Sequence, residues 1–152
     1  ALSWTLAAFA VAGVPDGRER RPIVLGAALI AGGVALQALV VPAMALAAIV
    51  GAGVVMGLGF GLSSSLINRR AIIHLTAQEE AIGSAALMTM RQVGGALGVA
   101  LAGVVANRAG FGDGLTDRTV AATANTVFLA AIPMALLGVA AAIVMTRRAA
   151  AR

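Results

Sequence analysis

Arg91 and Gln92 are the side chains of this sequence with the greatest potential for chemistry, because they interrupt an otherwise apolar stretch. That stretch, 79–106, opens with two carboxylates and is long enough to cross a bilayer core, which takes about 20 apolar residues. A cation inside such a segment is costly and usually faces protein or water. We therefore expect Arg91 and Gln92 to contact a substrate or to take part in a conformational change. The alternative is that Arg91 snorkels toward the lipid headgroups.

The other titratable groups near this stretch have a structural explanation. Thr76 and Glu79 fit the capping box S/T-x-x-E. Glu79 and Glu80 then lie in the first helical turn, where the macrodipole favours negative charge. A proton relay through His74 or Glu79 is the less favoured alternative. No Asp or Glu falls within a predicted spanning segment, so we expect any proton-coupling carboxylate to lie elsewhere.

Enzymatic and metal chemistry are not expected. The sequence has no cysteine and one histidine, which excludes a disulfide framework and a cysteine-based metal site. It shows no nucleophile–base pair and no ligand spacing. The glycine run at 57–61 lies inside an apolar segment with no strand before it, unlike a phosphate-binding loop. We predict no catalytic residue, no metal site, no cofactor and no enzyme activity.

The composition indicates a multi-pass protein of a cell membrane, plasma or inner, with the lipid bilayer as a partner. The chain is 61% hydrophobic and 11% charged, whereas soluble domains are about 45–50% apolar and about 25% charged. The sequence pI is near 11.8. Because the arginines are scattered through short loops and form no basic face, nucleic acid is not an expected partner.

The apolar blocks predict an all-α membrane bundle. We expect 1–152 to form a single membrane segment with four complete transmembrane helices and one partial one. The first block is too short to span, and the chain begins apolar without the features of a signal peptide, which suggests a piece of a longer protein. Pro133 is expected to kink the last helix. The predicted helices are 1–13 (partial), 22–41, 43–67, 77–106 and 120–147.

Two stripes of small residues predict close helix packing. They repeat every four residues, which places each set on one helical face where a neighbouring backbone can approach. Ser63, Ser64 and Ser65 follow the first stripe, and their hydroxyls are expected to bond back to helix carbonyls. The stripes are Gly53, Gly57 and Gly61, and Gly94, Gly98 and Ala102.

The arginines predict an orientation. The loops 14–22 and 67–78 and the C-terminal tail alternate with the turn at 41–42 and the loop 107–122. Most arginines outside the spanning segments belong to the first set, and only Arg108 and Arg118 belong to the second. By the positive-inside rule the first set, and with it the C-terminus, is expected in the cytoplasm.

The strings GLGFGLSSSLINRR (57–70) and EEAIGSAALMTMRQVGGALGVALAGVV (79–105) resemble the late spanning helices of major facilitator superfamily transporters. They look most like the fourteen-spanner multidrug:proton antiporter branch. The loop GVPDGRERRP (13–22) resembles less closely the cytoplasmic loop motif G-x-x-x-D-R-x-G-R-R. Asp16, Arg20 and Arg21 match it, while Gly17 and Glu19 replace the first Arg and the second Gly. The pattern R-Q-x-G-G-A-x-G-x-A falls on Arg91, Gln92, Gly94, Gly95, Ala96, Gly98 and Ala100.

The resemblance implies a major-facilitator-type bundle, of which this chain is the C-terminal portion. It implies alternating-access export of small, often lipophilic compounds, with binding between two six-helix halves. The implied partners are the N-terminal part of the same transporter, a small-molecule substrate and protons.

Two alternatives remain open. One is a major facilitator carrier of a metabolite or sugar. The other is a non-transport membrane scaffold or subunit, which predicts that these helices close into a bundle by themselves. A transporter segment instead predicts exposed faces of small and apolar residues.

Overall fold

The computed structural model describes residues 2–15, 17–73, 75–112 and 116–148. In these ranges the chain is all-helical, with five α-helices, one short 3₁₀ helix and no strand. The elements are α1 Leu2–Val11, α2 Arg20–Val40, η1 Val41–Ala43, α3 Leu46–Ile72, α4 Ala77–Arg108 and α5 Asp117–Arg148.

Four helices among the described residues are long and apolar enough to cross a membrane. They are α2 with η1, α3, α4 and α5. A helix rises 1.5 Å per residue, so a span of this length exceeds a hydrocarbon core of about 30 Å. α1 is apolar but shorter. The expectation of an all-α chain is confirmed for the described residues, and four of its helices have the length and composition of membrane-spanning segments.

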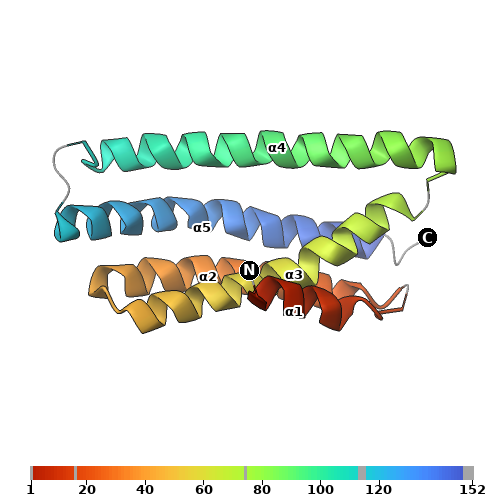
Figure 1. Ribbon diagram of the computed structural model, residues 1–152, viewed down its shortest axis with the longest axis horizontal. Helices are drawn as coiled ribbons and strands as arrows, with labels where there is room; N and C mark the ends of the chain where they lie inside the picture. The colour runs from red at the N-terminus through yellow and green to blue at the C-terminus, as the bar shows by residue number, and fades with distance from the viewer. Residues whose placement is uncertain (1, 16, 74, 113–115, 149–152) are drawn as a thin grey trace.

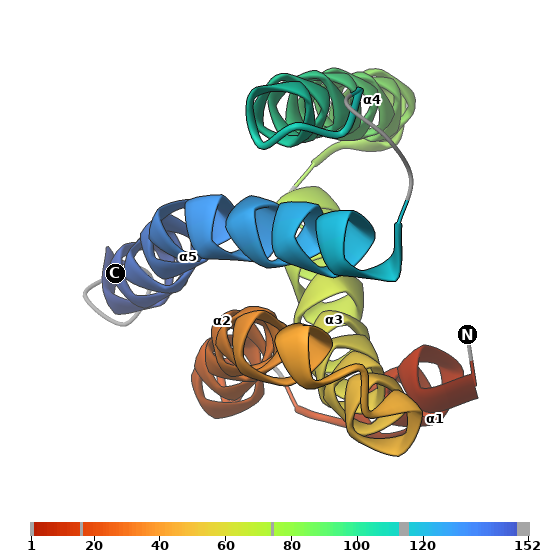
Figure 2. The same ribbon diagram turned by 90° about the vertical axis from the view of Figure 1, so that its left-hand side faces the viewer.

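α2 and α3 form the centre of the arrangement. α2 packs against both α3 and α5, and α1 lies along α3. One cluster of buried apolar side chains joins four helices, with Val11 from α1, Ile23 from α2, Leu66 from α3 and Ala142 from α5. α4 contributes no residue to this core, and its contacts with α5 and α3 are sparse. Figure 2 shows α4 set apart from the other helices, on the far side of α5.

The connections between the helices lie at two opposite ends of the molecule. The α1–α2 loop, the end of α3, the start of α4 and the end of α5 meet at one end, on the right in Figure 1. We call this the arginine end. The η1 turn and the α4–α5 connection lie at the opposite end, with Arg108 and Arg118. The described arginine side chains at the arginine end are Arg18, Arg20, Arg21, Arg69, Arg70 and Arg147.

Several boundaries differ from the sequence expectations. α2 begins at Arg20, so Pro22 lies in its first turn, where a missing N–H is tolerated. η1 ends at Ala43, and the next residue, Met44, has a left-handed φ of 52° that lets the chain reverse into α3. α3 continues to Ile72 instead of ending near 67. Most of the expected 67–78 connection is therefore helical.

The start of α4 forms the predicted capping box. The Thr76 backbone N–H donates to Glu79 Oε2 at 3.0 Å, and the Thr76 hydroxyl donates to the same oxygen at 2.8 Å. These bonds fix the first turn of a long helix that has few tertiary contacts there.

Candidate functional site

Helices α2 and α3 cross with their backbones in close contact. A Cβ atom built on Gly26 would lie 2.6 Å from the carbonyl oxygen of Gly59, and one built on Gly59 would lie 2.5 Å from the carbonyl oxygen of Gly26. Real Cβ atoms do not approach that closely, so both positions require glycine. Ser63, one turn later, donates its hydroxyl to the Gly59 carbonyl at 2.9 Å, as the sequence predicts.

The stripe Gly53, Gly57 and Gly61 packs on two different neighbours. Gly57 and Gly61 face α1, and a Cβ on Gly61 would lie 2.7 Å from that of Ala7. Gly53 has more room, since its nearest neighbour is Gln37 Nε2 at 3.8 Å. The first stripe therefore seats α1 against α3 through its last two glycines.

The second stripe is open. A Cβ on Gly94 or Gly98 would meet nothing within 4 Å. Gly98 and Ala102 line one wall of a hollow of about 350 Å³ between α4 and α5, opposite Val127 and Ala131. α4 thus presents a small-residue face that no described part of the chain fills.

Arg91 and Gln92 lie on this same loosely packed helix, and both are exposed. Within the described ranges, neither side chain makes a hydrogen bond or ion pair. Both candidates therefore lie exposed on α4, without a hydrogen-bond or ion-pair partner among the described residues of α1, α2, α3 or α5.

A charged cluster at the arginine end ties three segments together. Arg69 of α3 donates to Glu19 Oε1 through Nη2 at 2.5 Å and through Nε at 3.1 Å. Its Nη2 also donates to the Val14 carbonyl at 2.7 Å. Arg70 Nη1 lies 3.6 Å from Glu19 Oε2. We call Glu19, Arg69 and Arg70 the Glu19 cluster.

Glu19 is 5% exposed and precedes the first residue of α2. A buried carboxylate is stable as an ion only when it is paired and hydrogen-bonded. The two arginines at the end of α3 meet that need. The cluster anchors the α1–α2 loop to the end of α3.

Arg20 and Arg21, the two loop-motif candidates that the structure describes, are not part of this cluster. Arg20 and Arg21 are exposed, and Asp16 lies outside the described residues, as does His74. Glu19 was not a candidate because the motif pattern has glycine at that position. The available signal was a carboxylate among three arginines, with a second arginine pair at 69–70 on the same side of the membrane.

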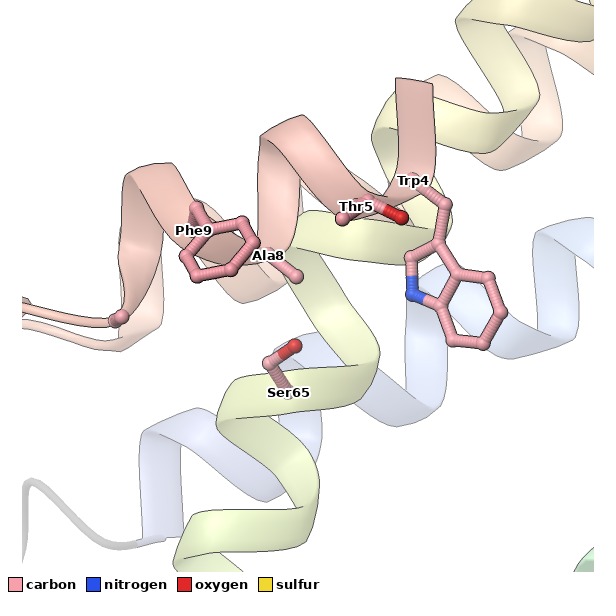
Figure 3. A pocket seen from close by; sticks show the side chains of 6 residues that line it. Trp4, Thr5, Ala8, Phe9 and Ser65 are labelled. Atoms are coloured by element: carbon pink, nitrogen blue, oxygen red, sulfur yellow. The ribbon is translucent and has the colours of Figure 1, made fainter. Parts of the chain in front are cut away.

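An aromatic pocket of about 440 Å³ lies between α1 and α3. Figure 3 shows Trp4 and Phe9 at its two sides, with Thr5 and Ala8 between them and Ser65 facing from α3. The Trp4 ring meets Phe60 edge-on, with centroids 5.5 Å apart and an interplanar angle of 85°. Aromatic side chains with only two hydroxyl side chains among them offer a surface suited to apolar molecules.

Three buried polar atoms lack a hydrogen-bond partner among the described residues: Gln37 Oε1, Thr123 Oγ1 and Asn125 Oδ1. Gln37 donates its Nε2 to the Ile49 carbonyl at 3.1 Å, so only half of its amide is satisfied. Such atoms cost free energy in a segment surrounded by hydrocarbon.

Comparison with protein-family models, with curated proteins and with solved structures finds no match to this chain.

Proposed function

We propose that this chain is the C-terminal part of a major-facilitator-type secondary transporter that exports small lipophilic compounds in exchange for protons by alternating access. The proposal rests on the pattern around Arg91 and on how the helices that carry it are packed. Its arginine end lies in the cytoplasm, since arginines are retained there.

The observation that carries the proposal is the open face of α4. A scaffold that is complete in these helices would bury its small-residue stripes. Here the α2–α3 and α1–α3 glycine contacts are closed, whereas Gly94 and Gly98 meet nothing. Glycine stripes in membrane helices serve close backbone approach. This supports a missing helix, from the rest of the transporter, as the neighbour of α4.

The depth of Arg91 supports a role beyond snorkelling. It lies fourteen residues beyond Ala77, or about 21 Å along α4. α4 has 32 residues and is about 48 Å long. If it is centred in a core of about 30 Å, Arg91 lies about 12 Å inside the core. A cation near the middle of a span costs about 2.5–3.5 kcal/mol, and this cost falls when it faces protein or a water-filled path.

The side chains that line the aromatic pocket bear on the polarity of the substrate. The aromatic pocket offers Trp4, Phe9 and the hydroxyl side chains of Thr5 and Ser65, and no carboxylate lies within the spanning core among the described residues. This favours neutral lipophilic compounds over sugars, whose hydroxyl groups need many polar partners. The carboxylates that couple export to protons belong to the remaining part of the protein.

The test is dye efflux by the complete protein in cells that lack their own pumps, with Arg91→Ala beside wild type. Arg108→Ala is the matched control, because Arg108 ends the same helix outside the core. We expect wild type and Arg108→Ala to lower cellular dye, and Arg91→Ala to fail at equal surface expression.

Equal export by all three proteins would reduce Arg91 to a bystander while leaving the export activity in place. Absence of export by the wild type would remove the multidrug assignment and favour the metabolite carrier or the scaffold.

A further inference from the structure

A groove of about 460 Å³ lies where α2, α3 and α5 meet. Its walls include Ala27 and Ile30 of α2, Ile67 of α3, and Gly138 and Ala141 of α5. The Ser63 hydroxyl in its wall already donates to a backbone carbonyl. The surface offered to an occupant is therefore apolar, which suits hydrocarbon rather than a polar ligand.

Two of the helices that line the groove carry an arginine on the same face, nearer the arginine end. On α3, Ser63, Ile67 and Arg70 are spaced by four and three residues, so they share one helical face running toward the arginine end. On α2, Arg20 precedes Ala27 by seven residues and shares its face in the same way. An occupant in the groove therefore has a cationic side chain beyond its end on two of the three helices.

The arginine end carries excess positive charge. Its described side chains include six arginines and three carboxylates. Glu79 and Glu80 lie on α4, which is set apart from α2 (Figure 2). Glu19 shares its single negative charge between Arg69 and Arg70, and the Arg70 contact, at 3.6 Å, is too long for a hydrogen bond. Positive charge and N–H donors thus remain available next to the groove.

We propose that this groove binds an anionic phospholipid of the bilayer. One acyl chain lies against Ala27, Ile67 and Ala141, and the phosphate accepts hydrogen bonds from Arg20 and Arg70. Basic pockets between transmembrane helices recognise anionic headgroups in this way. The proposal needs the chain to be in a membrane and does not depend on what it transports.

The experiment is a lipid titration of the purified complete protein followed by native mass spectrometry, with phosphatidylglycerol compared with phosphatidylcholine. Wild type should hold phosphatidylglycerol more tightly. Arg20→Gln/Arg70→Gln should weaken phosphatidylglycerol binding about 25-fold, since each arginine near a headgroup contributes about fivefold. Arg20→Lys/Arg70→Lys keeps the charges and should restore most of the binding. If the glutamine variant does not fold, the lysine variant still tests whether the positive charges hold the lipid.

The groove is tested separately with a matched pair on α5. Ala141→Phe fills the groove, whereas Val144→Phe adds the same ring at an exposed position outside its lining. Ala141→Phe should weaken binding at least about tenfold, because each displaced CH₂ is worth about fourfold. Val144→Phe should leave binding unchanged.

Inorganic phosphate serves as the competitor without an acyl chain and should not displace the lipid at millimolar concentration. Displacement by phosphate would show an ion site rather than a lipid site and would overturn the proposal. Equal binding of the two lipids, or equal binding by Ala141→Phe and Val144→Phe, would also overturn it.

Discussion

Gly26 and Gly59 cross with their backbones in contact, each glycine lying where a Cβ atom would touch the other's carbonyl oxygen. This contact sets the distance between α2 and α3, the two helices on which α1 and α5 pack. Closeness of this kind gives dispersion contacts that lipid cannot replace.

Gly26→Ala should therefore destabilise the protein. The added methyl group forces the two backbones apart, and overpacking of this kind costs about 1–3 kcal/mol. Gly32→Ala on the same helix is the control, because a Cβ there meets nothing within 4 Å. The measurement is the midpoint of thermal aggregation in detergent, followed by fluorescence-detected size-exclusion chromatography. Equal midpoints for the two variants would show that the crossing does not limit stability.

Glu19→Gln should loosen the α1–α2 loop from α3. The substitution leaves Arg69 and Arg70 facing each other without a carboxylate. We expect a loss of about 1–3 kcal/mol, less than for a fully buried pair because Arg69 is about one-third exposed. Glu80→Gln removes an exposed carboxylate at the same end and should have little effect. The double variant Glu19→Gln/Arg69→Gln should cost less than the sum of its single changes, and strict additivity would argue against the pairing.

Thr123→Val should stabilise the protein, whereas Thr146→Val should not. Both threonines are buried, but Thr123 Oγ1 has no hydrogen-bond partner among the described residues, whereas Thr146 donates to the Ala142 carbonyl at 2.8 Å. Valine has nearly the same shape and removes the unsatisfied hydroxyl, so Thr123→Val should stabilise by about 1 kcal/mol. Thr146→Val should be neutral or destabilising. The stability of both variants is measured with the same chromatographic assay. A destabilised Thr123→Val would show that the Thr123 hydroxyl has a hydrogen-bond partner in the membrane.

The orientation is testable because the chain has no cysteine. Gly13→Cys places a thiol at the arginine end, and Gly112→Cys places one at the opposite end. In a background without other cysteines, a membrane-impermeant maleimide should label Gly112→Cys in intact cells and Gly13→Cys only after lysis. The reverse pattern would put the arginine end outside and contradict the positive-inside assignment.

The spanning helices could be predicted from the sequence because hydrophobic length alone defines them. The capping box at Thr76 and the back-bonding of Ser63 were equally predictable, since both depend on residues three or four positions apart. Local patterns of this kind leave few alternatives.

The contacts between helices could not be predicted from the sequence in the same way. The sequence singled out the regular stripe at 53, 57 and 61, yet α2 and α3 cross at Gly59, which lies between two of those positions and on another face. A glycine spacing shows which face is small, but not which neighbour packs there. The Glu19 cluster joins residues fifty positions apart, so neither a helical period nor a loop motif could reveal it. The packing role of Gly94, Gly98 and Ala102 remains a prediction.

The central claim is secondary transport, and inside-out membrane vesicles containing the complete protein test it most directly. A pH gradient, acidic inside, is imposed and the accumulation of a lipophilic fluorescent dye is followed with time. We predict accumulation against the dye's concentration gradient, which stops when a protonophore collapses the pH gradient and is absent in Arg91→Ala vesicles. Accumulation equal to that in vesicles without the protein, or unaffected by the protonophore, would contradict proton-coupled export.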